Sequence, residues 1–379
     1  MFVRTIARLA TVGLSLLAAA VPAWGEAPRS LSFRPMYEAG HVELIEDVRF
    51  GSDDDDDLGV LYRPLDYCVD AEGNVFVLDY HLTCVKKFDR EGAHVRTFSR
   101  RGEGPGELAR PRNLTATADG RVVVFNLSGH RFSVFSNDGD YLDAHGFNGS
   151  VRRLESAPDG SIVAMFRFLQ HGWVQKGALY KVMRFSPDFS THVDIDSAYV
   201  RIEQVVHETD DAIMKALSPF VTQPHVAVSP LGRIVVGHSE VYVLKILSLD
   251  LEPVQKIERD AGREPVTDRD REDYLLRYAD DPDFQILVRE NVKFPRYKPF
   301  FKHIAVDHEG HIIVETYAGP APDGQAVHDV FDPAGDFVGR VTMRSGLGFR
   351  GGFAYAMMTG EREAPAVVRY RAARPESND

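Results

Sequence analysis

The chain has 379 residues, of which 44% are hydrophobic and 26% are charged, and its 56 acidic and 44 basic residues give a net charge of −12 at pH 7. This composition can fill a large core, which excludes a disordered or fibrous protein, and the acidic balance argues against binding nucleic acid through its phosphates. The two cysteines, Cys68 and Cys84, are too few for a disulfide framework or a four-cysteine zinc site.

The first 25 residues have the features of a secretory signal peptide. Arg4 and Arg8 precede a largely apolar run at 9–21, which is too short to span a bilayer comfortably, and small residues at positions 23 and 25 stand before Glu26. Cleavage there leaves 354 residues with 42 basic and 56 acidic side chains, so the net charge becomes −14. We therefore predict a periplasmic or secreted protein whose mature chain has no transmembrane segment.

Three segments precede the first repeat. Residues 26–40 form an N-terminal lead, and His41–Phe50 alternates as a half-buried strand should. Asp53–Asp57 concentrates five carboxylates that offer oxygen ligands for calcium, but it lacks the spaced ligands and turn glycine of a twelve-residue calcium loop. We expect this acidic run to be solvated and flexible.

The rest of the chain repeats one unit: an apolar strand, an Asp/Gly turn, a β-branched strand, a strand ending in an aromatic residue, a second glycine turn and a fourth strand. The first turn ends in a glycine at positions 73, 120, 160, 232, 310 and 352. Such units are typical of β-propellers, so we predict an all-β, six-bladed propeller as a single domain over 41–371, with a disordered tail at 372–379. The sixth copy supplies only two or three strands, and we expect His41–Phe50 to complete it and close the ring.

Two spacings between the turn glycines, 72 and 78 residues, are longer than the others and indicate insertions at about 199–222 and 262–300. Glu203, Val206, Ile213 and Leu217 suggest a short amphipathic helix in the first insertion, and the second begins with a helix capped by Thr267. Both insertions lie between the fourth strand of one blade and the first strand of the next. They therefore share one face, here called the decorated face, where we expect the binding site.

The run Arg-Arg-Gly-Glu-Gly-Pro-Gly-Glu-Leu at 100–108 follows the first blade. It resembles the signature of exported bacterial six-bladed propellers of the NHL-repeat, TolB-like group, and the resemblance covers nearly all of the mature chain. It implies the fold and a binding or scaffolding role, although a few NHL-type propellers are enzymes, including amidating lyases with zinc-bound histidines. A strand rather than a helix follows the run, so we expect a rigid turn that presents Glu103 and Glu107 instead of a nucleotide loop.

We expect a ring of polar residues around the channel. Each of them stands seven positions before a turn glycine, which is where the innermost strand of its blade begins. These residues are Asp66, Asn113, Arg153, His225, His303 and Ser345. The residues that follow them are mostly apolar, as expected when alternate side chains face the channel. Our predicted ligand-binding residues are Asp66, Asn113, Arg153, His225, His303, Arg101 and Glu103. Arginine forks at 100, 101 and 153 suit a carboxylate or a phosphate.

Three functional hypotheses follow. The leading one is a monomeric, non-enzymatic module without a cofactor, which binds a peptide, a protein partner or a small polar ligand at the decorated face and channel mouth. The alternative is a metal-dependent lyase or hydrolase, similar to the amidating lyases, in which His225, His303 and Asp66 hold zinc or calcium. A third histidine is missing from the ring, so this metal site would need Asp66 or a loop carboxylate. The third hypothesis is a structural module of an envelope assembly.

The two cysteines are expected on the first and third strands of one blade. Two strand spacings amount to roughly 9.6 Å, whereas a disulfide tolerates about 7 Å between Cα atoms. We therefore predict two free, buried thiols at Cys68 and Cys84.

Overall fold

A computed structural model describes residues 32–51, 58–169, 177–202, 204–208, 213–319, 321, 324–359 and 364–373. The predicted signal peptide, the acidic run Asp53–Asp57 and residues 374–379 lie outside this part of the chain. The lead contains a short helix, α1 (Arg34–Ala39). None of the helices in the described residues has the length and hydropathy that crossing a membrane requires.

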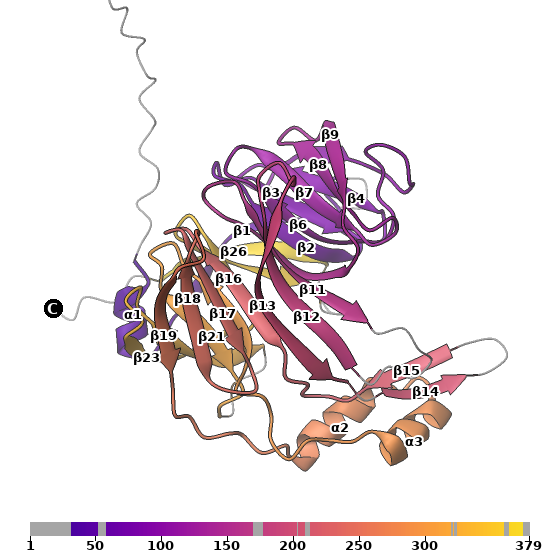
Figure 1. Cartoon of the computed structure of the whole chain (residues 1–379), viewed down its shortest axis with the longest axis vertical. Helices are drawn as coiled ribbons and strands as arrows, with labels where there is room; N and C mark the ends of the chain where they lie inside the picture. The colour runs from indigo at the N-terminus through magenta and orange to yellow at the C-terminus, as the bar shows by residue number, and fades with distance from the viewer. Residues whose placement is uncertain are drawn as a thin grey trace, which may run out of the picture. The chain divides into compact units, whose positions relative to one another are not determined.

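Six four-stranded antiparallel sheets, the blades, make up most of the described chain (Figure 1). The first three blades follow the chain order from the innermost strand outward. Blade one contains β2 (Pro64–Val69), β3 (Val75–Asp79), β4 (Cys84–Phe88) and β5 (His94–Phe98). Blade two contains β6 (Pro111–Ala116), β7 (Arg121–Asn126), β8 (Arg131–Ser136) and β9 (Tyr141–Gly146). Blade three contains β10 (Ser150–Ser156), β11 (Ile162–Leu169), β12 (Gly177–Phe185) and β13 (His192–Arg201).

The last three blades have the same arrangement, except that the sixth takes its outermost strand from the start of the chain. Blade four contains β16 (Pro224–Ser229), β17 (Arg233–His238), β18 (Val243–Ser248) and β19 (Pro253–Glu258). Blade five contains β20 (Phe301–Val306), β21 (Ile312–Thr316), β22 (Gln325–Phe331) and β23 (Phe337–Arg344). Blade six contains β24 (Gly348–Arg350), β25 (Phe353–Met358), β26 (Ala366–Ala372) and β1 (Leu44–Phe50).

The blades form a closed ring. Their innermost strands are neighbours in the order β2, β6, β10, β16, β20 and β24, and β2 also contacts β25 of blade six. The pairing of β1 with β26 runs from Leu44 opposite Ala372 to Phe50 opposite Val367. The predicted six-bladed propeller closed by an N-terminal strand is confirmed, and the pairing covers an edge of β26 that would otherwise be open.

Apolar side chains are packed between neighbouring blades. Strands β3 and β4 are buried at every position, because a blade lies on each of their faces, whereas the outer strand β5 is largely exposed. The turn after the innermost strand explains the repeated glycine. Asp70 accepts hydrogen bonds from the amides of Glu72 and Asn74, and Gly73 has a φ of 89°, which a residue without Cβ adopts freely.

The first insertion contains a β-hairpin, so the predicted amphipathic helix is wrong. Strand β14 (Gln204–Glu208) pairs with β15 (Ile213–Leu217). The second insertion is helical, as predicted, with α2 (Asp268–Leu276) and α3 (Pro282–Asn291), and Thr267 and Asp270 form a capping box. Hairpin and helices share an apolar cluster (Figure 1). Side chains at alternate positions of β15 point to the same face of the hairpin and can pack against the helices. This packing favours a strand over an isolated helical turn.

Cys68 on β2 and Cys84 on β4 are free, and their strands are the first and third of blade one, as predicted. Cys84 is buried, whereas Cys68 is only partly buried and contributes to the wall of a central cavity. The prediction of two buried thiols is therefore correct for Cys84 and wrong for Cys68. The reason is that the inner face of β2 borders a cavity instead of packed side chains.

Candidate functional site

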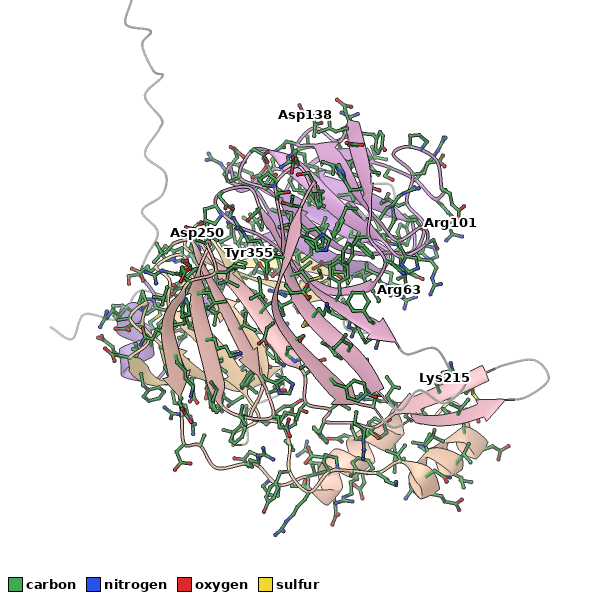
Figure 2. The ribbon with its side chains drawn as sticks, in the orientation of Figure 1. Arg63, Arg101, Asp138, Lys215, Asp250 and Tyr355 are labelled. Carbon is green, nitrogen blue, oxygen red and sulfur yellow. The ribbon has the colours of Figure 1, made fainter. Side chains whose placement is uncertain are left out.

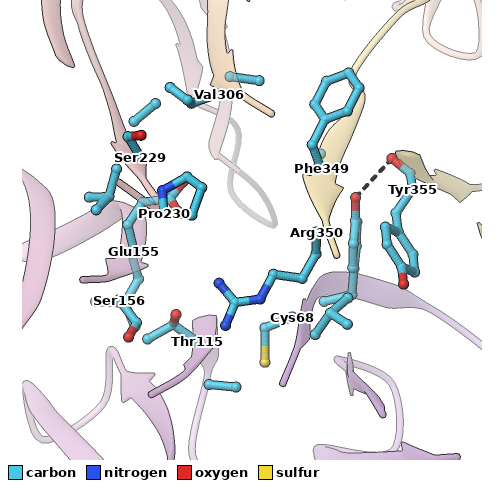
Figure 3. A pocket seen from close by; sticks show the side chains of 18 of the residues that line it. Cys68, Thr115, Glu155, Ser156, Ser229, Pro230, Val306, Phe349, Arg350 and Tyr355 are labelled. Carbon is cyan, nitrogen blue, oxygen red and sulfur yellow. Dashed lines mark hydrogen bonds between the residues drawn. The ribbon is translucent and has the colours of Figure 1, made fainter. Parts of the chain in front are cut away.

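A cavity of about 550 Å³ lies at the centre of the ring, and residues from all six blades line it (Figure 3). At one end it reaches Asp66, Arg153 and His303, where their strands begin. At the other end it reaches exposed residues in the turns after the innermost strands. These are Ala71, Ala118, Pro158, Pro230 and Gly351.

The positions of these rim residues show on which side the cavity opens. The insertions precede the innermost strands β16 and β20, whereas the exposed rim follows the innermost strands. The cavity therefore opens on the face opposite the decorated face. The sequence placed the binding site on the decorated face, and it contained no direct signal for the depth or direction of a central cavity.

Asp66 and Asn113, two members of the predicted ring, are in contact. The Asn113 Nδ2 and the backbone N of Leu114 both donate to Asp66 Oδ2 at 3.1 Å, which ties blade one to blade two. Burial raises the pKa of Asp66 to about 6, against the opposing effects of Arg153 and of these hydrogen bonds. The carboxyl group thus titrates close to neutrality.

Arg153 lies among the other ring residues. Its Nη2 is 2.6 Å from Glu155 Oε1, and its charge influences the pKa values of Asp66, His225 and His303. Burial, followed by the charge of Arg153, lowers the pKa of His303 to about 3, and burial, with smaller effects of His238 and Arg153, lowers that of His225 to about 4. Both imidazoles are therefore neutral at pH 7.

The arrangement of the ring does not fit a metal centre. The described residues contain one group of three His, Cys, Asp or Glu side chains with ligand atoms within 4.8 Å of one another, and its members are Asp307, Glu309 and His311. Asp66, His225 and His303 do not form such a group, and the nearby cation of Arg153 disfavours a second positive charge. The zinc or calcium site remains a prediction without geometric support.

The group around Asp307 has a structural explanation. Asp307 Oδ1 accepts the amides of Glu309 and His311 in the same turn that Asp70 forms in blade one. Its Oδ2 accepts the hydroxyl of Tyr37 from α1 at 3.2 Å and lies 3.0 Å from His311 Nδ1. Both oxygens are therefore occupied by protein donors, and the group anchors the N-terminal helix to blade five.

Arg350 on β24 is the cavity residue that the sequence reasoning missed. Its guanidinium projects into the middle of the cavity (Figure 3), and it forms no salt bridge with any described residue. The sixth repeat was aligned at Ser345, but this residue donates to Glu315 and the strand begins at Gly348. The available signal was a basic residue directly before the turn glycines Gly351 and Gly352.

Arg101 and Glu103 are exposed on the loop between β5 and β6 and do not line the cavity. Figure 2 shows Arg101 at the edge of the molecule. The loop is a rigid turn, as predicted, because Arg131 Nη2 donates to the carbonyl oxygens of Glu103, Gly104 and Glu107. Glu107 is not presented to solvent in the expected way, since its Oε2 accepts the amide of Gly104 at 3.0 Å. The structure thus separates this loop from the ring residues.

Comparisons with known proteins support the fold. No protein-family model and no curated protein matches the chain. A solved structure of a DUF4221 family member from Bacteroides vulgatus is similar, with 10% identity, a TM-score of 0.51, and coverage of 88% of this chain and 98% of that one. The fold is a six-bladed β-propeller.

Two other similar structures have TM-scores just under 0.5. One is a protein from Bacteroides fragilis that is presumed to be exported, with 10% identity, a TM-score of 0.49, and coverage of 88% of this chain and 96% of that one. The other is a gluconolactonase from Xanthomonas campestris, with 13% identity, a TM-score of 0.48, and coverage of 93% and 97%. Identities this low indicate a shared fold only, and membership of the NHL-repeat, TolB-like group stays a prediction.

Proposed function

We propose that this protein is an exported binding module that takes a small polar ligand with a carboxylate or another anionic group into its central cavity. The observation that carries the proposal is Arg350, a partly buried guanidinium in the middle of the cavity without an acidic partner among the described residues. A charge removed from water is costly unless it is paired. A ligand carboxylate can supply the missing partner through two parallel hydrogen bonds.

The size and the lining of the cavity suit such a ligand. A volume of about 550 Å³ lies within the range of small-molecule sites, roughly 300 to 1,000 Å³, and is too small for a folded protein. Thr115, Ser156 and Ser229 add hydroxyl groups to the wall, beside apolar residues such as Phe349 (Figure 3). The arginine would orient the ligand, the hydroxyl groups would bind its polar substituents, and the apolar wall would exclude water. Export through the predicted signal peptide belongs to the same proposal.

The test is a ligand screen on the mature protein with acetate, succinate, glutamate and galacturonate, read by thermal shift and then by calorimetry. We expect at least one of these carboxylates to raise the melting temperature. Arg350→Gln keeps most of the side-chain length and removes the charge. Loss of a buried charged pair is worth about 2 kcal/mol or more, so the variant should bind at least about 30-fold more weakly.

Arg371→Gln provides the matched control, because Arg371 is exposed on β26 and the substitution changes the net charge equally. It should bind like the wild type. The proposal is wrong if no carboxylate stabilises the protein, or if Arg350→Gln binds as tightly as the control.

A further inference from the structure

Three innermost strands begin with a β-bulge that contains a basic residue. Irregular pairing places Arg112 in the bulge of β6, Arg152 in that of β10 and Lys302 in that of β20. A bulge inserts an extra residue and redirects its side chain. The bulges lie where the strands begin, so these basic residues belong to the decorated face, away from the mouth of the central cavity.

Four arginines near the starts of the innermost strands of blades one to three lack charged partners among the described residues, unlike Lys302. Lys302 Nζ lies 2.8 Å from Glu315 Oε1. The arginine cluster, defined here as Arg63, Arg112, Arg152 and Arg167, has no guanidinium that forms a salt bridge or hydrogen bond with the described residues. Arg167 Nε is moreover a buried atom without any hydrogen-bond partner. Buried donors are nearly always satisfied in folded proteins, so this atom is available to an acceptor from water or from a ligand.

Several contacts place these arginines close together. The guanidinium carbons of Arg63 and Arg112 lie 5.0 and 6.0 Å from the centre of the same ring, that of Tyr80. In the register of strands β10 and β11, Arg167 stands opposite Ser150, at the end of β10 where the Arg152 bulge occurs. Burial, followed by the positive charge of Arg167 and with a further effect of Arg112, lowers the pKa of Arg152.

The cluster is unusual for a protein with a net charge of −12, which has more than enough carboxylates to neutralise it. Like charges that lie close together destabilise the folded state, and functional sites often carry such a cost. A guanidinium binds carboxylate, sulfate or phosphate through a planar fork, and neighbouring forks match neighbouring anionic groups.

We propose that the arginine cluster is a second binding site, distinct from the central cavity, for a ligand with two or more closely spaced oxyanion groups. The unpaired forks of Arg112, Arg152 and Arg167 would bind the oxyanions, and Arg63, held over Tyr80, would add positive charge at the edge. The site lies on the decorated face, so both ligands can be bound at once. This proposal does not depend on the function proposed for the cavity.

Calorimetry on the mature protein tests the site with three probes: pyrophosphate, citrate and a disulfated disaccharide. Inorganic phosphate, acetate and inorganic sulfate serve as the respective single-anion references. We expect at least one probe to bind at least tenfold more tightly than its single-anion reference, and its affinity to fall as sodium chloride is added. The preferred probe shows whether the natural group is a phosphate, a carboxylate or a sulfate.

The decisive variant is Arg152→Gln/Arg167→Gln. It should weaken binding of the preferred probe at least tenfold. Of the single variants, Arg152→Lys should lose less affinity for the probe than Arg152→Gln, because lysine keeps the positive charge although it lacks the planar fork. Without ligand, the double variant should melt at the same or a higher temperature than the wild type, since repulsion is relieved. A purely structural role predicts a lower melting temperature.

Arg90→Gln/Arg96→Gln is the control with the same charge change, at two exposed arginines that pair with Glu91 and Asp140. It should change binding less than twofold, as should Arg350→Gln. If the double variant does not fold, Arg112→Gln replaces it in the comparison. The proposal is overturned if no probe binds, or if the control weakens binding as much as the cluster variant.

Discussion

Glu315 joins blades five and six, and its substitution is a sharp test of how the ring is held together. The side chain is 4% exposed. Its Oε1 accepts the Ser345 hydroxyl at 2.6 Å and lies 2.8 Å from Lys302 Nζ, and its Oε2 accepts the amide of Gly346 at 2.8 Å. His328 Nε2 is 3.7 Å from the same Oε2.

The cost of replacing Glu315 follows from these partners. Glu315→Gln keeps one acceptor oxygen, so either the Ser345 hydroxyl or the Gly346 amide loses its acceptor, which costs about 1 to 3 kcal/mol. Glu315→Ala removes both acceptors and leaves the Lys302 charge without its partner, which costs about 3 to 5 kcal/mol. We expect the free energy of unfolding to decrease in this order from wild type through Gln to Ala.

The effect should also depend on pH. Burial alone would raise the pKa of Glu315, but the hydrogen bonds from His328, Lys302, Ser345 and Gly346 outweigh it and hold the pKa well below its ordinary value of 4.5. A lowered pKa in the folded state contributes stability above pH 4.5 that is lost as the pH falls. The difference between wild type and Glu315→Gln should therefore shrink in acid.

Urea unfolding of the mature protein at pH 7 and at lower pH measures these differences. Glu258→Gln is the control, because Glu258 is exposed and pairs with exposed Lys256, so we expect a change within about 0.5 kcal/mol. A Glu315→Gln variant as stable as this control at pH 7 would refute the reasoning.

Two further predictions concern titrating groups around the cavity. The pKa of Asp66 is raised by burial from 3.8 to about 6, so its favourable contribution is complete below pH 3.8 and is lost as the pH rises through 6. Relative to wild type, the free energy of unfolding of Asp66→Asn should therefore rise by up to about 3 kcal/mol between pH 4 and pH 8. If the difference in unfolding free energy between the two proteins, measured with urea, did not change with pH, the reasoning would be contradicted. Burial raises the pKa of the Cys68 thiol well above its ordinary value and that of Cys84 to about 11, so both should react slowly with Ellman's reagent at pH 8 in the folded protein. Two thiols should titrate at once after denaturation, and rapid reaction of either one before denaturation would be inconsistent with the structure.

The blades and their closure were predictable because they depend on short-range patterns. A glycine at positive φ ends each first turn from Gly73 to Gly352, and two strands flank it within a few residues. The repeat also aligned Asp66 with Asn113 correctly, and these side chains form a hydrogen bond across two blades. The closing strand was inferred from the incomplete sixth copy, whose outer edge needed a partner.

The failures occur where the chain departs from the repeat. The first insertion has both helical spacing and strand alternation, and packing of Ala216 against the helices of the second insertion selected the hairpin. Arg350 was missed because the innermost strand of blade six has only three residues. The bulge at Arg152 is flanked by Val151 and Arg153 and has no glycine or proline next to it, and Pro111 before Arg112 is equally compatible with the first residue of a regular strand.

Local hydrogen bonding and the alternation of side chains thus determine where strands and turns form, and these are properties of a few consecutive residues. The direction of the cavity and the grouping of unpaired arginines depend on residues that are distant in the chain, such as Arg63 and Arg167 or Asp66 and Arg350. The members of each pair reach the same site only after the ring closes. Short-range patterns carry no information about which distant charges remain without a partner, so the two proposed sites emerged from the packed structure.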